Sequence, residues 1–193
     1  MAQTANPIDI YLEIGQKRTF AGAVAWPGWC RSGRDEATAL QALLDYGSRY
    51  AHVLHTAHIK FQAPTDIVAF TVVERLTGNT TTDFGAPSIA PTPDKQPVDD
   101  AELQRFQTLL KVYWRVLDKA VAAAAGKELR KGPRGGGREI DGIMGHVLDA
   151  EAGYLAHLAW KQKQTKKDPS EKAVQIHQAV LDALTASAHG ETP

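Results

Sequence analysis

Apolar and polar residues alternate near the start of the chain, which is the pattern of a β-strand with one covered face. The alternation runs from Ile8 to Ile14, and a second strand is predicted from Thr19 to Trp26 after a turn over residues 15–18. Pro27 and Gly28 end this second strand, because proline donates no ladder hydrogen bond and glycine bends freely. The two strands are predicted to pair as a hairpin.

The apolar positions that follow recur at intervals of three and four, which is the period of an amphipathic helix. This helix is predicted over residues 35–57, with Ser32 or Asp35 as its N-cap. A segment rich in β-branched residues follows from Ile67 to Leu76, bounded by Pro64 and by the turn residues TGN. The predicted order is β-β-α-β, a small sheet with one helix.

Residues 79–98 have the composition of an extended linker. They contain four prolines among Thr, Ser, Asp and Gly residues, and such a segment does not pack a core of its own. A domain boundary is therefore predicted here, with a first domain at residues 7–78 and a second domain at residues 99–190.

The second domain is predicted to be entirely helical. Apolar residues keep the helical period over residues 99–126, 138–163 and 169–190. Suitable capping or terminating residues stand at several of these ends, namely Asp99 or Asp100, Gly126, Ser170 and Gly190. The predicted fold class is thus α+β: a small ββαβ domain followed by an all-α up-down bundle with three helices in this chain.

Composition and charge exclude several classes of partner. Lys plus Arg equal Asp plus Glu at 22 each, so no net field attracts the chain to nucleic acid or to an anionic membrane. The N-terminus MAQTANPIDI has neither a basic start nor an apolar run, and the single cysteine cannot form an internal disulfide. A cytoplasmic protein with no membrane segment and no nucleic-acid partner is expected.

The segment TFAGAVAWPGWCRSGRDEATALQALLDY resembles the HicB-like fold. The likeness covers about residues 7–76 and rests on a strand ending in Pro-Gly, a short return strand, and a helix opened by an acidic cluster. It implies a small sheet with one helix, a degenerate relative of the ribonuclease H fold. In that family the domain binds a toxin partner, often beside a separate DNA-binding module, so an antitoxin role is one expectation.

The segment REIDGIMGHVLDAEAGYLAHL is similar to the second helix of the DinB/YfiT-like helical bundles. That family implies four helices, a divalent metal held by three histidines, and thiol-linked transferase or isomerase chemistry. The first of these histidines falls on His146, whereas the His-x3-His pair of the last helix has no counterpart. The resemblances together imply an uncharacterised bacterial HicB-like and DinB-like fusion that lacks the last bundle helix.

The spacing of the remaining histidines argues against a metal site within one helix. At about 1.5 Å rise per residue, His146 and His157 lie about 16 Å apart, and His177 and His189 about 18 Å apart. The ligands of one nickel or zinc ion must lie within about 4 to 5 Å of one another. Neither pair can therefore chelate one ion by itself.

Glu151 and His146 are the candidate metal residues. Glu151 falls near the middle of a predicted apolar stripe of its helix, where a carboxylate is costly unless it is paired or ligates a cation. The stripe consists of Ile140, Met144, Val147, Tyr154, Leu155 and Leu158. His146 lies about 140° away around the helix, at about 100° per residue. A nickel or zinc ligand is one interpretation of each; the alternatives are a surface or interface histidine, and a carboxylate paired with Arg or Lys.

Three further features have competing interpretations. His52, His55 and His58 stand at i, i+3 spacing and are either a partial metal site or histidines near a helix C-terminus. Cys30 is either a reactive thiol beside Arg31 or a small buried side chain in a return strand. The glycine-rich residues 129–138 are either an anion site at a helix start or an interhelical loop.

The function expected first is binding or regulation without catalysis, because the metal set is incomplete and no nucleophile with its base is visible. The alternative is a DinB-type, divalent-metal-dependent, thiol-linked transferase or isomerase, and the weaker one is a HicB-like antitoxin. A bundle with three of four helices would leave an apolar groove. A homodimer through the bundle, or a small-molecule or protein partner, is therefore expected.

Overall fold

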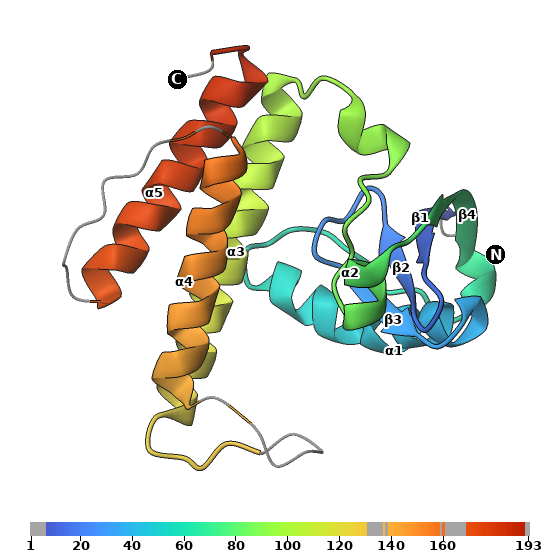
Figure 1. The fold of residues 1–193 in the computed structure, drawn as a ribbon, viewed down its shortest axis with the longest axis horizontal. Helices are drawn as coiled ribbons and strands as arrows, with labels where there is room; N and C mark the ends of the chain where they lie inside the picture. The colour runs from blue at the N-terminus through green and yellow to red at the C-terminus, as the bar shows by residue number, and fades with distance from the viewer. Residues whose placement is uncertain (1–6, 131–136, 138, 159, 161–168, 192–193) are drawn as a thin grey trace. The chain divides into compact units, whose positions relative to one another are not determined.

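The computed structural model describes residues 7–130, 137, 139–158, 160 and 169–191. The chain divides into two compact units, residues 1–96 and 97–193, which are described separately (Figure 1). The fold is mixed α+β, as predicted, with one four-stranded sheet and five α-helices in the described ranges. The predicted count was four helices, one in the first domain and three in the bundle. The fifth is a short helix in the predicted linker.

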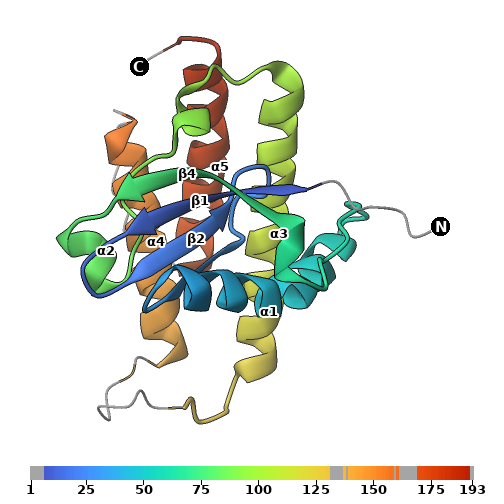
Figure 2. The ribbon, with the colours of Figure 1, turned by 90° about the vertical axis from the view of Figure 1, so that its right-hand side faces the viewer.

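The sheet of the first unit has the order β3-β2-β1-β4 (Figure 2). Its strands are β1 (Ile8–Ile14), β2 (Thr19–Ala23), β3 (Cys30–Gly33) and β4 (Phe70–Thr77). β2 pairs antiparallel with β1 on one side and with β3 on the other, and β4 pairs parallel with the other edge of β1. The order along the chain is therefore β-β-β-α-β, because the return strand β3 is a full member of the sheet.

The predicted second strand ends early because the chain reverses within it. Trp26 to Trp29 form a turn in which Trp29 N–H donates to Trp26 O at 3.0 Å and Gly28 has φ 87°. Proline at the second position and a positive-φ glycine at the third define a type II turn. The N–H of Ala23 donates to the carbonyl of Trp29 at 3.0 Å, so β2 stops at Ala23 and β3 follows at once.

Helix α1 (Glu36–His55) covers one face of the sheet. Asp35 caps its start and forms a capping box with Thr38. The buried residues of the helix recur at the helical period: Ala39, Leu43, Gly47, Tyr50 and Leu54. They pack with Ile10 and Leu12 of β1 and with Trp29, whose indole N–H donates to Leu43 O at 3.0 Å. This is the core of the first unit.

A register shift between β1 and β4 changes which side chains share a face. Phe70 and Val72 lie opposite Ile8 and Ile10, but Glu74 lies opposite Tyr11. The extra residue in β4 is a β-bulge, which turns the following side chains to the other face. Glu74 and Tyr11 therefore belong to the second face of the sheet, which α1 does not cover.

Residues 79–96 lie against this second face and belong to the first unit, which differs from the predicted linker. They form helix α2 (Thr80–Phe84) and a 3-10 turn, Thr92–Lys95. Glu13 of β1, which has 0% exposure, accepts hydrogen bonds from the Thr82 hydroxyl, from Ser88 N–H and from Ile89 N–H. The segment packs no apolar core of its own, but it satisfies a buried carboxylate.

The second unit contains α3 (Asp100–Ala124), α4 (Ile140–His157) and α5 (Pro169–Ala188). Asp99 caps α3, as predicted. Figure 1 shows that α4 and α5 run in the same direction and α3 runs opposite to them, whereas an up-down bundle was predicted. Within the described ranges, no helix has both the length and the apolar character needed to cross a bilayer.

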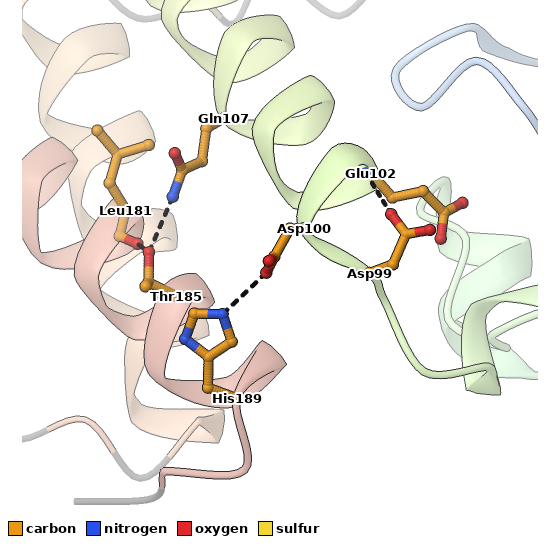
Figure 3. A network of polar contacts seen from close by, with 7 residues as sticks. All are labelled: Asp99, Asp100, Glu102, Gln107, Leu181, Thr185 and His189. Atoms are coloured by element: carbon orange, nitrogen blue, oxygen red, sulfur yellow. Dashed lines mark hydrogen bonds and ion pairs between the residues drawn. The ribbon is translucent and has the colours of Figure 1, made fainter.

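Polar pairs fix the register between α3 and α5 (Figure 3). His189 Nε2 lies 3.1 Å from Asp100 Oδ1, and the Gln107 side-chain amide donates to Thr185 Oγ1 at 2.9 Å. Thr185 in turn donates to Leu181 O at 2.9 Å. The start of α3 therefore lies beside the end of α5, as an antiparallel pair requires.

The role of Glu13 can be tested by substitution. Glu13→Ala leaves one hydroxyl and two amide donors without their acceptor, so we expect a loss of about 3 kcal/mol in the free energy of unfolding. The matched control is Asp9→Ala, an exposed acid on the same strand, which should change the value by less than about 0.5 kcal/mol. Urea unfolding measures both. Faster amide exchange at Ser88 and Ile89 in Glu13→Ala alone would locate the effect, and equal stability of the two variants would contradict it.

Candidate functional site

Glu151 of α4 lies where the three helices of the second unit meet. Its side chain is 18% exposed, so it is largely removed from water. Next to it on α4, Leu148, Ala152 and Leu155 pack with Ile176 and Ala183 of α5. The carboxylate is thus at the edge of an apolar cluster, where it needs polar partners.

Trp114 of α3 and His177 of α5 are those partners. The indole Nε1 of Trp114 donates to Glu151 Oε1 at 2.7 Å, and His177 Nε2 lies 3.3 Å from Glu151 Oε2. The imidazole is also stacked on the indole, with ring centroids 3.9 Å apart and an interplanar angle of 8°. We call these three residues the Glu151 cluster. It joins one side chain from each helix.

The two carboxylate oxygens of Glu151 have different hydrogen-bonding environments. Oε1 has a short hydrogen bond from a neutral donor, whereas Oε2 is buried and has no hydrogen bond of good geometry. The contact of Oε2 with His177 is an ion pair whenever the imidazole is protonated. The predicted partner of Glu151 was Arg or Lys; in the structure it is an indole and an imidazole.

The sequence indicated Glu151 but not its partners. Trp114 follows the apolar period of α3 as any core aromatic would, and His177 is one of seven histidines without a local motif. Their meeting depends on the antiparallel register of α3 and α5, which also pairs residues 100 with 189 and 107 with 185. Such a register is set by contacts distant in sequence, so a helical period alone does not reveal it.

The other predicted metal residue, His146, is exposed on α4. The Glu151 cluster offers a metal one carboxylate and one imidazole, and the ion would need at least one further ligand. Among the residues that the structure describes, no three His, Cys, Asp or Glu side chains are placed to hold a metal ion. These residues therefore do not form a complete ligand set, and the metal role of His146 and Glu151 stays a prediction.

The remaining candidates lie apart from this cluster. His52, His55 and His58 are exposed at the end of α1 and just beyond it. The anion-binding interpretation falls mainly on residues 131–136 and 138, which lie outside the described residues. Cys30 begins β3, half-buried, with its Sγ 4.0 Å from the Tyr11 hydroxyl. Burial raises the pKa of the Cys30 thiol above its ordinary value, although Tyr11 and Arg31 oppose the shift, so the thiol is poorly disposed to act as a nucleophile.

A double-mutant cycle tests the Glu151 cluster. Trp114→Phe removes the indole donor and Glu151→Ala removes its acceptor, so their effects on the free energy of unfolding should be non-additive by about 1 to 2 kcal/mol. The control cycle pairs Trp114→Phe with Asp149→Ala, an exposed acid of α4 that binds Lys172 instead. That cycle should be additive within about 0.5 kcal/mol. Additivity in the first cycle would show that the hydrogen bond does not couple α3 to α4.

In comparisons with known proteins, no family model, no curated protein and no solved structure matches this chain. The HicB-like and DinB-like resemblances of the two halves are neither supported nor contradicted by this result. Both therefore stay predictions.

Proposed function

We propose that this protein is a binding or regulatory protein without catalysis of its own, and that it associates with a second copy of itself through helix α4. The observation that carries the proposal is the apolar character of α4 on its outer side. Ile143 and Leu158 are each 38% exposed and Tyr154 is 70% exposed. Large apolar side chains in this number on one helix are typical of an interaction surface.

These side chains form one continuous row. On an ideal helix, residues 143, 147, 150, 154 and 158 follow each other at steps of three and four and lie within about 80° of one another. We call this row the outer seam. It lies beside the buried stripe of Leu148, Ala152 and Leu155, so the apolar arc of α4 extends well beyond the part that α5 covers.

A second copy of the chain is the partner that fits the outer seam best. A row with three- and four-residue spacing is self-complementary, because the same row on another helix can interdigitate with it. The formal net charge of the chain is zero, so two copies do not repel each other through a net field. Pairing would add a helix against the exposed half of the apolar arc.

The two family resemblances are part of this proposal. What supports a HicB-like first unit is its small sheet with one long helix, α1, and what supports a DinB-like second unit is a set of helices with an uncovered apolar arc. Protein binding suits both, since a HicB-like domain implies a protein partner and the exposed apolar side chains of α4 imply a surface that covers them. The antitoxin role itself stays the weaker alternative.

The dimer can be tested by a charge placed in the outer seam. Tyr154→Glu should weaken self-association at least about tenfold, because it buries an unpaired charge at the interface. The matched control is Phe84→Glu, which changes an apolar residue that is 90% exposed in the first unit. Sedimentation equilibrium should find a dimer for the wild-type chain and the control. A monomeric wild-type chain, or an unchanged dimer in Tyr154→Glu, would overturn the proposal.

A metal-dependent transferase or isomerase is the second candidate, and one observation favours it. Glu151 Oε2 is buried without a hydrogen bond and faces His177, so a carboxylate and an imidazole are already adjacent. If this candidate is correct, the purified protein should hold stoichiometric nickel or zinc, lost in Glu151→Gln and in His177→Ala and also in His146→Ala if that histidine is a ligand. Elemental analysis measures this. A folded, metal-free wild-type protein after growth with both metals would exclude it.

A further inference from the structure

Positive charge gathers at the edge of the sheet that β3 forms. β3 is the last strand in the order β3-β2-β1-β4, so one of its edges has no neighbouring strand. Residues 30–34 read CRSGR, and further arginines come from the turn before β2 and from α1. We call Arg18, Arg31, Arg34 and Arg49 the arginine rim. Among the described residues, no carboxylate forms an ion pair with any of the four.

Two arginines of the rim share one aromatic ring on α1. The guanidinium carbon of Arg31 lies 3.2 Å from the centroid of the Tyr46 ring, and that of Arg49 lies 5.6 Å from it. The ring attracts a cation over its face, which holds the Arg31 side chain in place. Two positive groups this close to one ring also repel each other. Asp45 does not neutralise them, since its carboxylate accepts a hydrogen bond from Gln41 at 2.7 Å.

A third arginine lies on the opposite face of the same edge. The Arg18 guanidinium donates to Ser32 Oγ at 3.1 Å. Side chains alternate along a strand, so Ser32 points away from the face on which Arg31 meets α1. The nearby acids Asp35 and Asp83 are bound elsewhere, by Thr38 N–H and by Lys17 N–H. The edge therefore has a guanidinium on each face.

The backbone of β3 can accept a further strand. Ala23 N–H donates to Trp29 O, and residues 31 and 33 lie opposite Ala21 and Thr19. Because hydrogen bonding alternates along an antiparallel strand, Cys30 and Ser32 direct their N–H and C=O groups away from β2. The Cys30 carbonyl accepts a hydrogen bond from the Arg31 guanidinium at 3.2 Å, so it is reached from outside the sheet. Within the described ranges, the Ser32 N–H and C=O have no partner.

The charge of the rim decides which partner fits this edge. A second copy of β3 would bring arginines against arginines, which is unfavourable between paired strands. Single-stranded nucleic acid binds by stacking its bases on exposed aromatic rings, but Arg31 already covers a face of Tyr46. An extended peptide with carboxylates satisfies both the outward backbone groups and the guanidiniums.

We propose that an extended peptide segment with two adjacent acidic residues adds as a strand to the free edge of β3. Adjacent side chains of a strand point to opposite faces, so one carboxylate meets Arg31 and Arg49 and the next meets Arg18. The inference names a partner class for the binding function proposed above. It uses residues of the first unit alone, so a monomeric wild-type chain would leave it unaffected.

Titration of the full chain with the capped peptide TVEEVT, followed by amide chemical shifts at low salt, tests the proposal. We expect saturable shifts at the amides of Cys30 and Ser32. Binding should be at least about tenfold weaker in Arg31→Gln, because charge-assisted hydrogen bonds are lost, and about threefold weaker in Arg49→Gln. The matched control is Arg130→Gln, an exposed arginine outside the rim, which should bind like the wild type. Thermal unfolding checks that the variants fold.

Comparison ligands separate strand addition from other kinds of binding. The neutral peptide TVQQVT should bind at least about tenfold more weakly than TVEEVT. Methyl groups on both glutamate amides remove the inward donor in either register, so this peptide should also bind at least about tenfold more weakly. Equal binding of either peptide, equal binding in both rim variants, or the absence of saturable shifts would each overturn the proposal. Tighter binding of a ten-residue oligothymidylate at the same amides would also overturn it, in favour of a nucleic-acid surface.

Discussion

The buried carboxylate of Glu13 is the constraint on which the first unit depends. A carboxylate with 0% exposure on a β-strand is strongly unfavourable unless every lone pair that faces the protein has a donor. The donors come from residues 82, 88 and 89, so the chain after β4 must turn back across the second face of the sheet. That return places the 3-10 turn, and with it Asp94, beside Tyr11. The sheet is therefore covered on both faces. Helix α1 packs on one face through apolar side chains, and residues 79–96 are held on the other face by hydrogen bonds.

The β-bulge in β4 is what makes this polar layer possible. Without the extra residue, Glu74 would share a face with Phe70 and Val72, under α1, where a charge is costly. With it, Glu74 faces the same side as Glu13 and can bind Thr92. The hydrogen bonds from Thr92 lower the pKa of Glu74, so the anchor stays ionised and intact at neutral pH. One inserted residue therefore separates an apolar face from an acidic one.

The sequence predicted the elements whose signal is local and missed those that depend on distant partners. β1, α1 and the start of α3 follow from alternation, helical period and the caps Asp35 and Asp99. Residues 79–96 have a linker composition, and they are held on the sheet by Glu13 and Glu74, two acceptors on distant strands. The apolar stripe predicted on α4 included Tyr154, which is 70% exposed in the structure. The helical period shows which residues share an apolar face, but it does not show which part of that face another helix covers. The sequence indicated Glu151 because it is a charged residue on an apolar face of its helix. Its partners Trp114 and His177 can be identified only when the register between α3 and α5 is known.

The polar contacts of the second unit are better understood as register determinants than as sources of stability. A buried carboxylate with an unbonded oxygen is a weak stabiliser, because desolvation offsets most of the gain from its partners. The apolar faces of α3 and α5 alone would tolerate a shift of one turn, since residues three and four apart are similar along both helices. Such a shift would separate Asp100 from His189, Gln107 from Thr185 and Trp114 from His177 at once. We infer that the three pairs together select one alignment of α3 and α5.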